Sequence, residues 1–155
     1  MSSPQSAGVL PFRRSAGTVQ VLLVHPGGPF WKRKDAGAWT IPKGEFEAHE
    51  DALGAARREF QEELGFALEG EFLALAPVRQ RGGKTVHAFA VEADFDPSGV
   101  ASNTFTLEWP PRSGKLSAFP EVDRAEWFTL EVARQKINAG QVPLLQQLQE
   151  LLHGS

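Results

Sequence analysis

The segment 44–66 reads GEFEAHEDALGAARREFQEELGF and contains the pattern that decides the fold. Its fixed positions follow the spacing G-x5-E-x7-R-E-U-x-E-E-x-G-U, in which U is a bulky apolar residue. The residues at these positions are Gly44, Glu50, Arg58, Glu59, Phe60, Glu62, Glu63, Gly65 and Phe66. An ordinary solvated face of a helix is also rich in glutamate, but it does not require glycines at fixed distances on both sides.

Residues 49–64 favour an amphipathic helix. The apolar positions recur at intervals of three and four residues, at Leu53, Ala56, Phe60 and Leu64, as on one buried face. At about 100° per residue, Glu59, Glu62 and Glu63 share a stripe a quarter of a turn from that face. Three neighbouring carboxylates repel one another unless a cation lies between them. Hard divalent ions such as Mg²⁺ or Mn²⁺ prefer oxygen ligands, so the spacing indicates a metal site.

The two glycines favour this interpretation over a surface helix. Gly44 precedes the helix, where a strand must turn sharply into a loop, and Gly65 follows the last apolar position as a C-cap. On a plain surface helix, Arg57 and Arg58 would only form exposed pairs worth a few tenths of a kcal/mol. The complete pattern therefore describes a strand, a loop, a helix and a second loop.

The segment resembles the signature box of the Nudix hydrolases, which cleave nucleoside diphosphates linked to another moiety. This resemblance implies an α/β fold, in which an α/β/α sandwich surrounds a central mixed sheet. It also implies attack of water on a pyrophosphate, assisted by Mg²⁺ or Mn²⁺. By motif position, Glu59, Glu62 and Glu63 would be metal ligands and one of them could be the base. Arg58 would orient a carboxylate, and Gly44 would let the backbone approach the metal.

Composition limits the remaining classes of function. The chain has 155 residues, of which 41% are hydrophobic, enough for one compact domain. We expect residues 1–7 to be flexible and residues 8–155 to form this domain. The net charge is −3 and no basic run occurs, so nucleic acid is not an expected partner. The sequence leaves open whether the protein is a homodimer.

Neither a membrane nor an oxidising compartment is indicated. No apolar stretch approaches about 18 residues, and the first residues, MSSPQSA, are short and polar rather than a signal peptide. The chain has no cysteine, which excludes disulfides and thiolate chemistry and suits the cytoplasm. We therefore expect a cytoplasmic protein.

The rest of the chain alternates between strand patterns and helix patterns. Expected strands are 8–13, 18–25, 38–42, 71–78, 85–92, 104–109 and 124–128. Expected helices after the box are 130–139 and 143–153, the second beginning at Pro143. VQVLLVH is apolar nearly throughout, as a strand covered on both faces should be. Sheet with helices on both faces is the natural arrangement.

Several residues outside the box are candidates for substrate contacts. Trp39 precedes the box and could stack on a base, or it could be a core tryptophan. Lys43, adjacent to Gly44, is placed for phosphate. Arg81 and Lys84 flank a glycine turn that is either a plain hairpin or a cationic cover for the acidic site.

Glu121 follows a long proline- and glycine-rich excursion of the kind that often carries binding residues. It resembles the glutamate outside the box that many Nudix proteins use as base or metal ligand. The alternative is a surface carboxylate. The general base is therefore assigned either to Glu121 or to one glutamate of the box.

The family resemblance leaves the substrate open. The chain has no tyrosine, a residue that often follows the box in members that cleave dinucleoside polyphosphates. It also lacks the proline about sixteen residues after the box that is typical of ADP-ribose hydrolases, and the arginine motif of coenzyme A hydrolases. WTIPKGE nevertheless resembles dinucleoside and inositol polyphosphate hydrolases. We expect a small nucleotide-like diphosphate as substrate; the alternatives are an inositol polyphosphate and a Nudix-fold module that senses nucleotides without hydrolysis.

Overall fold

A mixed sheet forms the centre of the computed structural model, which describes residues 4–80 and 82–153. Its strands are β1 (Gln5–Ser15), β2 (Thr18–Pro26), β3 (Lys43–Glu45), β4 (Leu73–Ala74), β5 (Val78–Arg79), β6 (Thr85–Glu92) and β9 (Val122–Thr129). The strand order is β4-β6-β1-β2-β9, while β3 also pairs with β1 and β5 with β6. β1 and β6 are parallel, whereas β2 is antiparallel to both β1 and β9.

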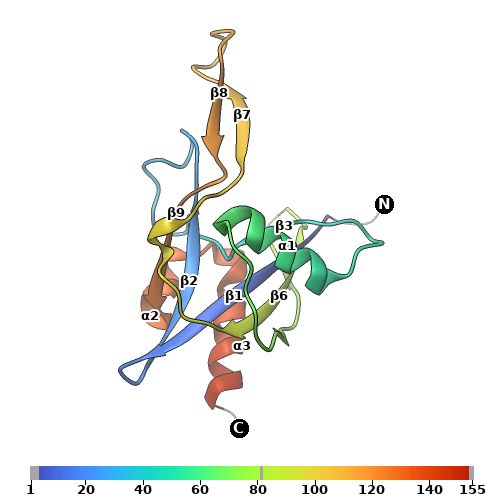
Figure 1. Ribbon diagram of the computed structural model, residues 1–155, viewed down its shortest axis with the longest axis vertical. Helices are drawn as coiled ribbons and strands as arrows, with labels where there is room; N and C mark the ends of the chain where they lie inside the picture. The colour runs from blue at the N-terminus through green and yellow to red at the C-terminus, as the bar shows by residue number, and fades with distance from the viewer. Residues whose placement is uncertain (1–3, 81, 154–155) are drawn as a thin grey trace.

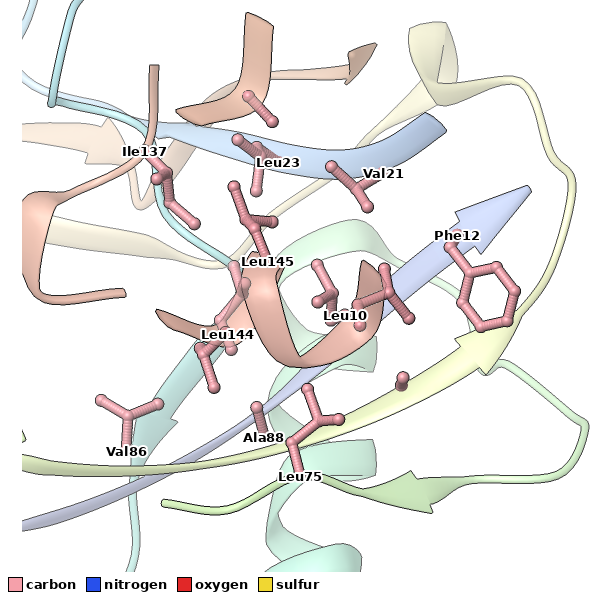
Figure 2. Packing of buried hydrophobic residues seen from close by; sticks show 14 of the residues in the cluster. Leu10, Phe12, Val21, Leu23, Leu75, Val86, Ala88, Ile137, Leu144 and Leu145 are labelled. Atoms are coloured by element: carbon pink, nitrogen blue, oxygen red, sulfur yellow. The ribbon is translucent and has the colours of Figure 1, made fainter. Parts of the chain in front are cut away.

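Helices cover both faces of this sheet, as Figure 1 shows. Helix α1 (Ala52–Leu64) lies on one face, and α2 (Leu130–Lys136) and α3 (Val142–His153) lie on the other. Successive side chains of a strand point to opposite faces, so Leu22 packs in the cluster of α1 and Leu23 in the cluster of α3. Figure 2 shows Leu144 and Leu145 of α3 among the strand residues of the latter cluster. The predicted α/β/α sandwich is confirmed.

The box helix ends where its sequence predicts but begins later than predicted. It ends at Leu64, and Gly65 follows with φ of 88° and donates its N–H to the carbonyl of Gln61. It begins at Ala52, three residues later than predicted, because Asp51 is the N-cap and its side chain accepts a hydrogen bond from the Gly54 N–H. His49 therefore belongs to the preceding loop.

Several other predicted boundaries are wrong, among them that of helix 130–139, which ends at Lys136. β1 begins at Gln5, three residues before the predicted start of this strand, while residues 1–3 lie outside the described residues. Segment 38–42 forms only isolated bridges, Val24 with Thr40 and Trp39 with Ile137, and the regular strand follows it as β3. Segment 71–78 is divided between the two-residue strands β4 and β5.

The long excursion after β6 forms a separate two-stranded sheet. Strands β7 (Thr104–Glu108) and β8 (Leu116–Pro120) pair in antiparallel register, and the hairpin projects from the domain (Figure 1). The sequence predicted β7 but missed β8. A short 3-10 turn, η1 (Pro97–Gly99), precedes the hairpin, and another, η2 (Ala139–Gln141), connects α2 to α3.

Candidate active site

The glutamates of α1 lie where this helix meets the loop around β3. Glu63 is buried, with 8% of its surface exposed, whereas the side chains of Glu59 and Glu62 are 14% and 41% exposed. Glu63 lies beside the apolar positions that hold the helix on the sheet, and Glu62 lies toward solvent. The helix therefore presents a graded set of carboxylates, from the protein interior to the surface.

Gly44 packs directly against the carboxylate of Glu59. A Cβ atom on Gly44 would lie 1.9 Å from Oε1 of Glu59 and 2.2 Å from its Cδ. The backbone of Gly44 is not in the left-handed region, so the need for glycine here comes from space alone. Gly44 and Glu59, fifteen residues apart in the box, are thus in direct contact in the structure.

Arg58 connects two carboxylates of the box. Its Nη1 donates to Oε2 of Glu50, and its Nη2 donates to Oε2 of Glu59 at 3.2 Å. Glu50 also accepts a hydrogen bond from the backbone N–H of Glu47, which fixes it to the loop before the helix. These bonds limit the orientations open to the Glu59 carboxylate. The position of Arg58 suits the orienting role that the box implies.

Burial and mutual repulsion shift the titration of the two inner glutamates. Burial, followed by the charge of Glu59, raises the pKa of Glu63 to about 8. Burial also raises the pKa of Glu59, and the charges of Glu62 and Glu121 act in the same direction. In the protein without a cation, the carboxylates therefore resist full ionisation.

Lys43 is a second cation, besides Arg58, that interacts electrostatically with these glutamates. Burial, and then the charge of Lys84, lowers the pKa of Lys43, while Glu63, Glu45 and Glu59 act against this shift. The backbone of Lys43 also forms a hydrogen bond with the carboxyl group of Glu63. The ammonium group of Lys43 is thus close enough to Glu59 and Glu63 to interact with their charges.

Glu121 is brought to the same place by backbone hydrogen bonds from distant parts of the chain. Its N–H donates to the carbonyl of Asn103 at 2.8 Å, and its carbonyl accepts from the Gly27 N–H at 3.0 Å. The Asn103 N–H in turn donates to the carbonyl of Glu62 at 3.0 Å. These bonds connect the turn between β8 and β9 to α1, and the charge of Glu121 raises the pKa of both Glu59 and Glu63.

The structure contradicts one of the predicted substrate contacts. Trp39 is 1% exposed and belongs to the core, with its Nε1 donating to Asp35 at 2.8 Å. His25 and Phe128 pack against the ring edge to face, and the Arg124 guanidinium lies 5.0 Å from its centre. No face remains for a base, so the alternative of a core tryptophan is correct.

Of the two cations that flank the glycine turn, only Lys84 lies among the described residues. Lys84 lies near Lys43, and its Nζ is 3.6 Å from Oε1 of Glu45. It therefore lies beside Glu45 and close to Lys43. Arg81 lies outside the described residues, so its predicted contact stays a prediction.

The carboxylates suit a divalent ion by donor chemistry but are not arranged around one. Among residues 4–80 and 82–153, no group of three or more His, Cys, Asp or Glu side chains is placed to hold a metal. The side chains of Glu59, Glu62 and Glu63 nevertheless supply hard oxygen donors. A cation there would also offset the repulsion that raises the pKa of Glu63. The donor chemistry of the three residues therefore fits such an ion.

Sequence reasoning missed the aromatic side chains of the hairpin. Phe105 lies against Gly28, and the Trp109 ring lies 5.6 Å from that of Phe30. Apolar residues alternate in TFTLEW and recur in KLSAFP on the two sides of a proline- and glycine-rich turn. This pattern is typical of a hairpin with one apolar face and could have revealed it.

Comparisons with known proteins bear on the family and the fold of this chain. A family model described as NUDIX domain matches residues 3–148. Among curated protein sequences, none matches. An Ap4A hydrolase from C. elegans, solved as a binary complex, has a similar fold: the TM-score is 0.67 with 24% identity, over 98% of this chain and 99% of that one.

Two further solved structures are similar in fold. The NUDIX domain of Shewanella oneidensis NrtR, complexed with ADP ribose, has a TM-score of 0.68 with 16% identity, over 98% of this chain and 90% of that one. A MutT structure, described for Aliivibrio salmonicida and Vibrio cholerae, has a TM-score of 0.57 with 19% identity, over 96% of this chain and 97% of that one. The structural likeness shows the fold, and the family model, which spans nearly the whole chain, shows the family. The chain belongs to the Nudix hydrolase family, whose members act on phosphoric anhydride bonds.

Proposed function

We propose that this protein is a divalent-metal-dependent pyrophosphohydrolase that cleaves a nucleoside diphosphate linked to another moiety. The observation that supports this most is the contact of Gly44 with the Glu59 carboxylate, beside the buried Glu63. Two carboxylates with raised pKa values lie there next to the ammonium group of Lys43. Such a site has groups for a cation and for a phosphate side by side.

Glu59, Glu62 and Glu63 would hold the ion, with the backbone at Gly44 close enough to contribute. A bound Mg²⁺ or Mn²⁺ would polarise phosphoryl oxygens and lower the pKa of water. Arg58 keeps the Glu59 carboxylate in one orientation through its 3.2 Å hydrogen bond. Lys43 offsets charge on the phosphates of the substrate.

The carboxylate of Glu121 is our candidate for the group that takes the proton from the attacking water. It is exposed at the junction of β8 and β9 and acts electrostatically on both inner glutamates. A general base must be within hydrogen-bond reach of the proton it removes, and the backbone bonds to Asn103 and Gly27 hold this residue at the cluster. The box glutamates, once engaged with a cation, are poorer proton acceptors.

The substrate class follows from the charge pattern and from similar proteins. The named neighbours include an Ap4A hydrolase and a domain complexed with ADP ribose, both of which concern nucleotides with a diphosphate linkage. Lys84 and Lys43, which lie near each other, provide cations for two neighbouring phosphates. No helix among the described residues has the length and apolar composition to cross a membrane. We place the protein in the cytoplasm, where such nucleotides occur.

A hydrolysis panel tests this function. Nucleoside triphosphates, dinucleoside polyphosphates, nucleotide sugars, ADP-ribose and an inositol polyphosphate are each incubated with Mg²⁺ or Mn²⁺, and the products are separated by chromatography. We expect cleavage of an anhydride bond in at least one nucleotide class, and none in EDTA. Glu69→Gln is a suitable control, because Glu69 is exposed after α1 and pairs only weakly with Arg57. Binding of these compounds without any turnover would instead indicate a sensing module.

A further inference from the structure

A pocket lies between the projecting hairpin and the loop after β2. It has a volume of about 330 Å³, and its walls are Gly28, Pro29, Lys32, Trp109, Phe119, Pro120 and Asp123. We call it the hairpin pocket. Two larger hollows, of about 410 and 540 Å³, contain no residue of the box or of the hairpin. The hairpin pocket differs from them in being lined by Pro120, the residue that precedes Glu121.

The hairpin turns an apolar face toward this pocket. Along β7 and β8, half-buried residues alternate with exposed ones, and Phe105 and Phe119 of the half-buried set are cross-strand neighbours with ring centres 5.9 Å apart. An isolated two-stranded hairpin is marginally stable in water, so the contacts of Phe105 with Gly28 and of Trp109 with Phe30 hold it in place. These contacts cover the aromatic face only in part, and the rest lines the pocket.

The base of the hairpin is fixed at the acidic cluster. Pro120 lines the pocket, and the next residue, Glu121, acts on the box glutamates. A Cβ atom on Gly27 would lie 2.0 Å from the carbonyl oxygen of Pro120, so the loop and the hairpin are in close backbone contact there. A molecule whose phosphate lies at Lys43 and the box therefore has the hairpin pocket beside it.

The polar groups of the pocket suit an aromatic heterocycle rather than a plain hydrocarbon. Nδ1 of the buried His25 is 2.8 Å from Oδ1 of Asp123, and Nε2 is 2.7 Å from the carbonyl oxygen of Lys34. These contacts fix the Asp123 carboxylate, whose side chain is 32% exposed, at the pocket wall. A fixed carboxylate accepts hydrogen bonds from ring or exocyclic N–H groups, and the rings of Trp109 and Phe119 offer flat surfaces.

We propose that the hairpin pocket binds the base of the nucleotide substrate, with Trp109 as the stacking residue and Asp123 as a hydrogen-bond acceptor. The proposal rests on the proposed function, since it takes a nucleotide as the substrate. It replaces Trp39, whose ring is buried, as the site of base recognition. The volume suits one base, so the remainder of the substrate extends past Glu121 to the box.

Equilibrium binding tests this assignment without requiring turnover. AMP, GMP, CMP and UMP are titrated into the full chain with Mg²⁺ by NMR, and ribose 5-phosphate serves as the probe without a base. None of these compounds contains an anhydride bond, so none is consumed. We expect at least one nucleotide to bind about tenfold or more tightly than ribose 5-phosphate. Trp109→Leu should remove this advantage, and Trp109→Phe, which keeps a ring, should retain most of it.

Trp31→Leu is the matched control, because Trp31 lies in the loop after β2 but is not part of the pocket lining. This variant should keep the advantage. If circular dichroism shows that Trp109→Leu is misfolded, Phe119→Leu, a second aromatic residue of the pocket lining, takes its place. The proposal is overturned if no nucleotide binds more tightly than ribose 5-phosphate, or if the advantage survives in the folded pocket variant. A failed hydrolysis panel with the binding pattern intact would overturn the proposed function alone.

Discussion

Gly44→Ala should separate catalysis from stability. The new Cβ would lie 1.9 Å from Oε1 of Glu59, whereas ordinary van der Waals contact begins near 3.4 Å. The carboxylate must therefore retreat by roughly 1.5 Å, which it can do because it ends a flexible side chain. A misplacement of about 1 Å can cost around 100-fold in rate. We expect kcat/KM to fall by about 10- to 100-fold, with the free energy of unfolding changed by less than ~1 kcal/mol.

Gly54→Ala provides the matched control for this experiment. Gly54 lies in the first turn of the same helix, and a Cβ there would come no closer than 3.5 Å to Asp51. Alanine should stabilise the protein by up to about 1 kcal/mol and leave kcat/KM unchanged. Steady-state kinetics and urea unfolding measure both quantities. If Gly44→Ala retained wild-type kcat/KM, the position of the Glu59 carboxylate would not matter for the reaction, and the reasoning would be refuted.

Three further outcomes are expected. Metal-free protein should lose stability as pH rises from about 4.5 to about 8, because the folded state holds a proton on Glu63 that the unfolded state releases. Thermal melts in EDTA should show the melting temperature falling over this pH range, and Glu63→Gln should reduce that fall. Glu121→Gln should lower kcat by ~10²–10⁴ with metal affinity retained, whereas Glu126→Gln on the following strand β9 should leave kcat unchanged; equal kcat values for wild type and Glu121→Gln would show that Glu121 is not the base. Gln141→Ala should lower the free energy of unfolding by ~1–3 kcal/mol, because the Ile41 N–H loses its buried acceptor. Gln146→Ala, on the exposed side of α3, should change the free energy of unfolding in urea by less than ~0.5 kcal/mol. Similar values for the two variants would contradict this prediction.

The helix of the box was predictable because its information is local. The period of its apolar residues fixes which side chains reach the core, and Phe60 and Leu64 are buried as that period requires. The same period sets Glu59 and Glu62 aside from the core, although Glu63 is more buried than a position on a polar stripe suggests. The start of the helix was less predictable, because Asp51 and His49 are both plausible first residues until the cap is seen.

Residues whose roles depend on distant partners were harder to predict. Trp39 lies in a segment that looks like a strand, but Ile137 and Val24 engage it only through isolated bridges, and its ring fills the core beside Phe128. The approach of Glu121 to α1 depends on the carbonyl of Asn103 and the N–H of Gly27. No local pattern reports such contacts, since both partners are far along the chain.

The central claim is that the box carboxylates bind a divalent cation and that hydrolysis depends on it. Mn²⁺ binding, followed by electron paramagnetic resonance, should be compared with hydrolysis of the best substrate in the same samples, for wild type, Glu63→Gln and the exposed control Glu69→Gln. We predict that activity rises in parallel with bound Mn²⁺ in wild type and Glu69→Gln, and that Glu63→Gln loses at least tenfold in both affinity and turnover while remaining folded. Full activity in EDTA, or unaltered Mn²⁺ dependence in Glu63→Gln, would contradict the claim.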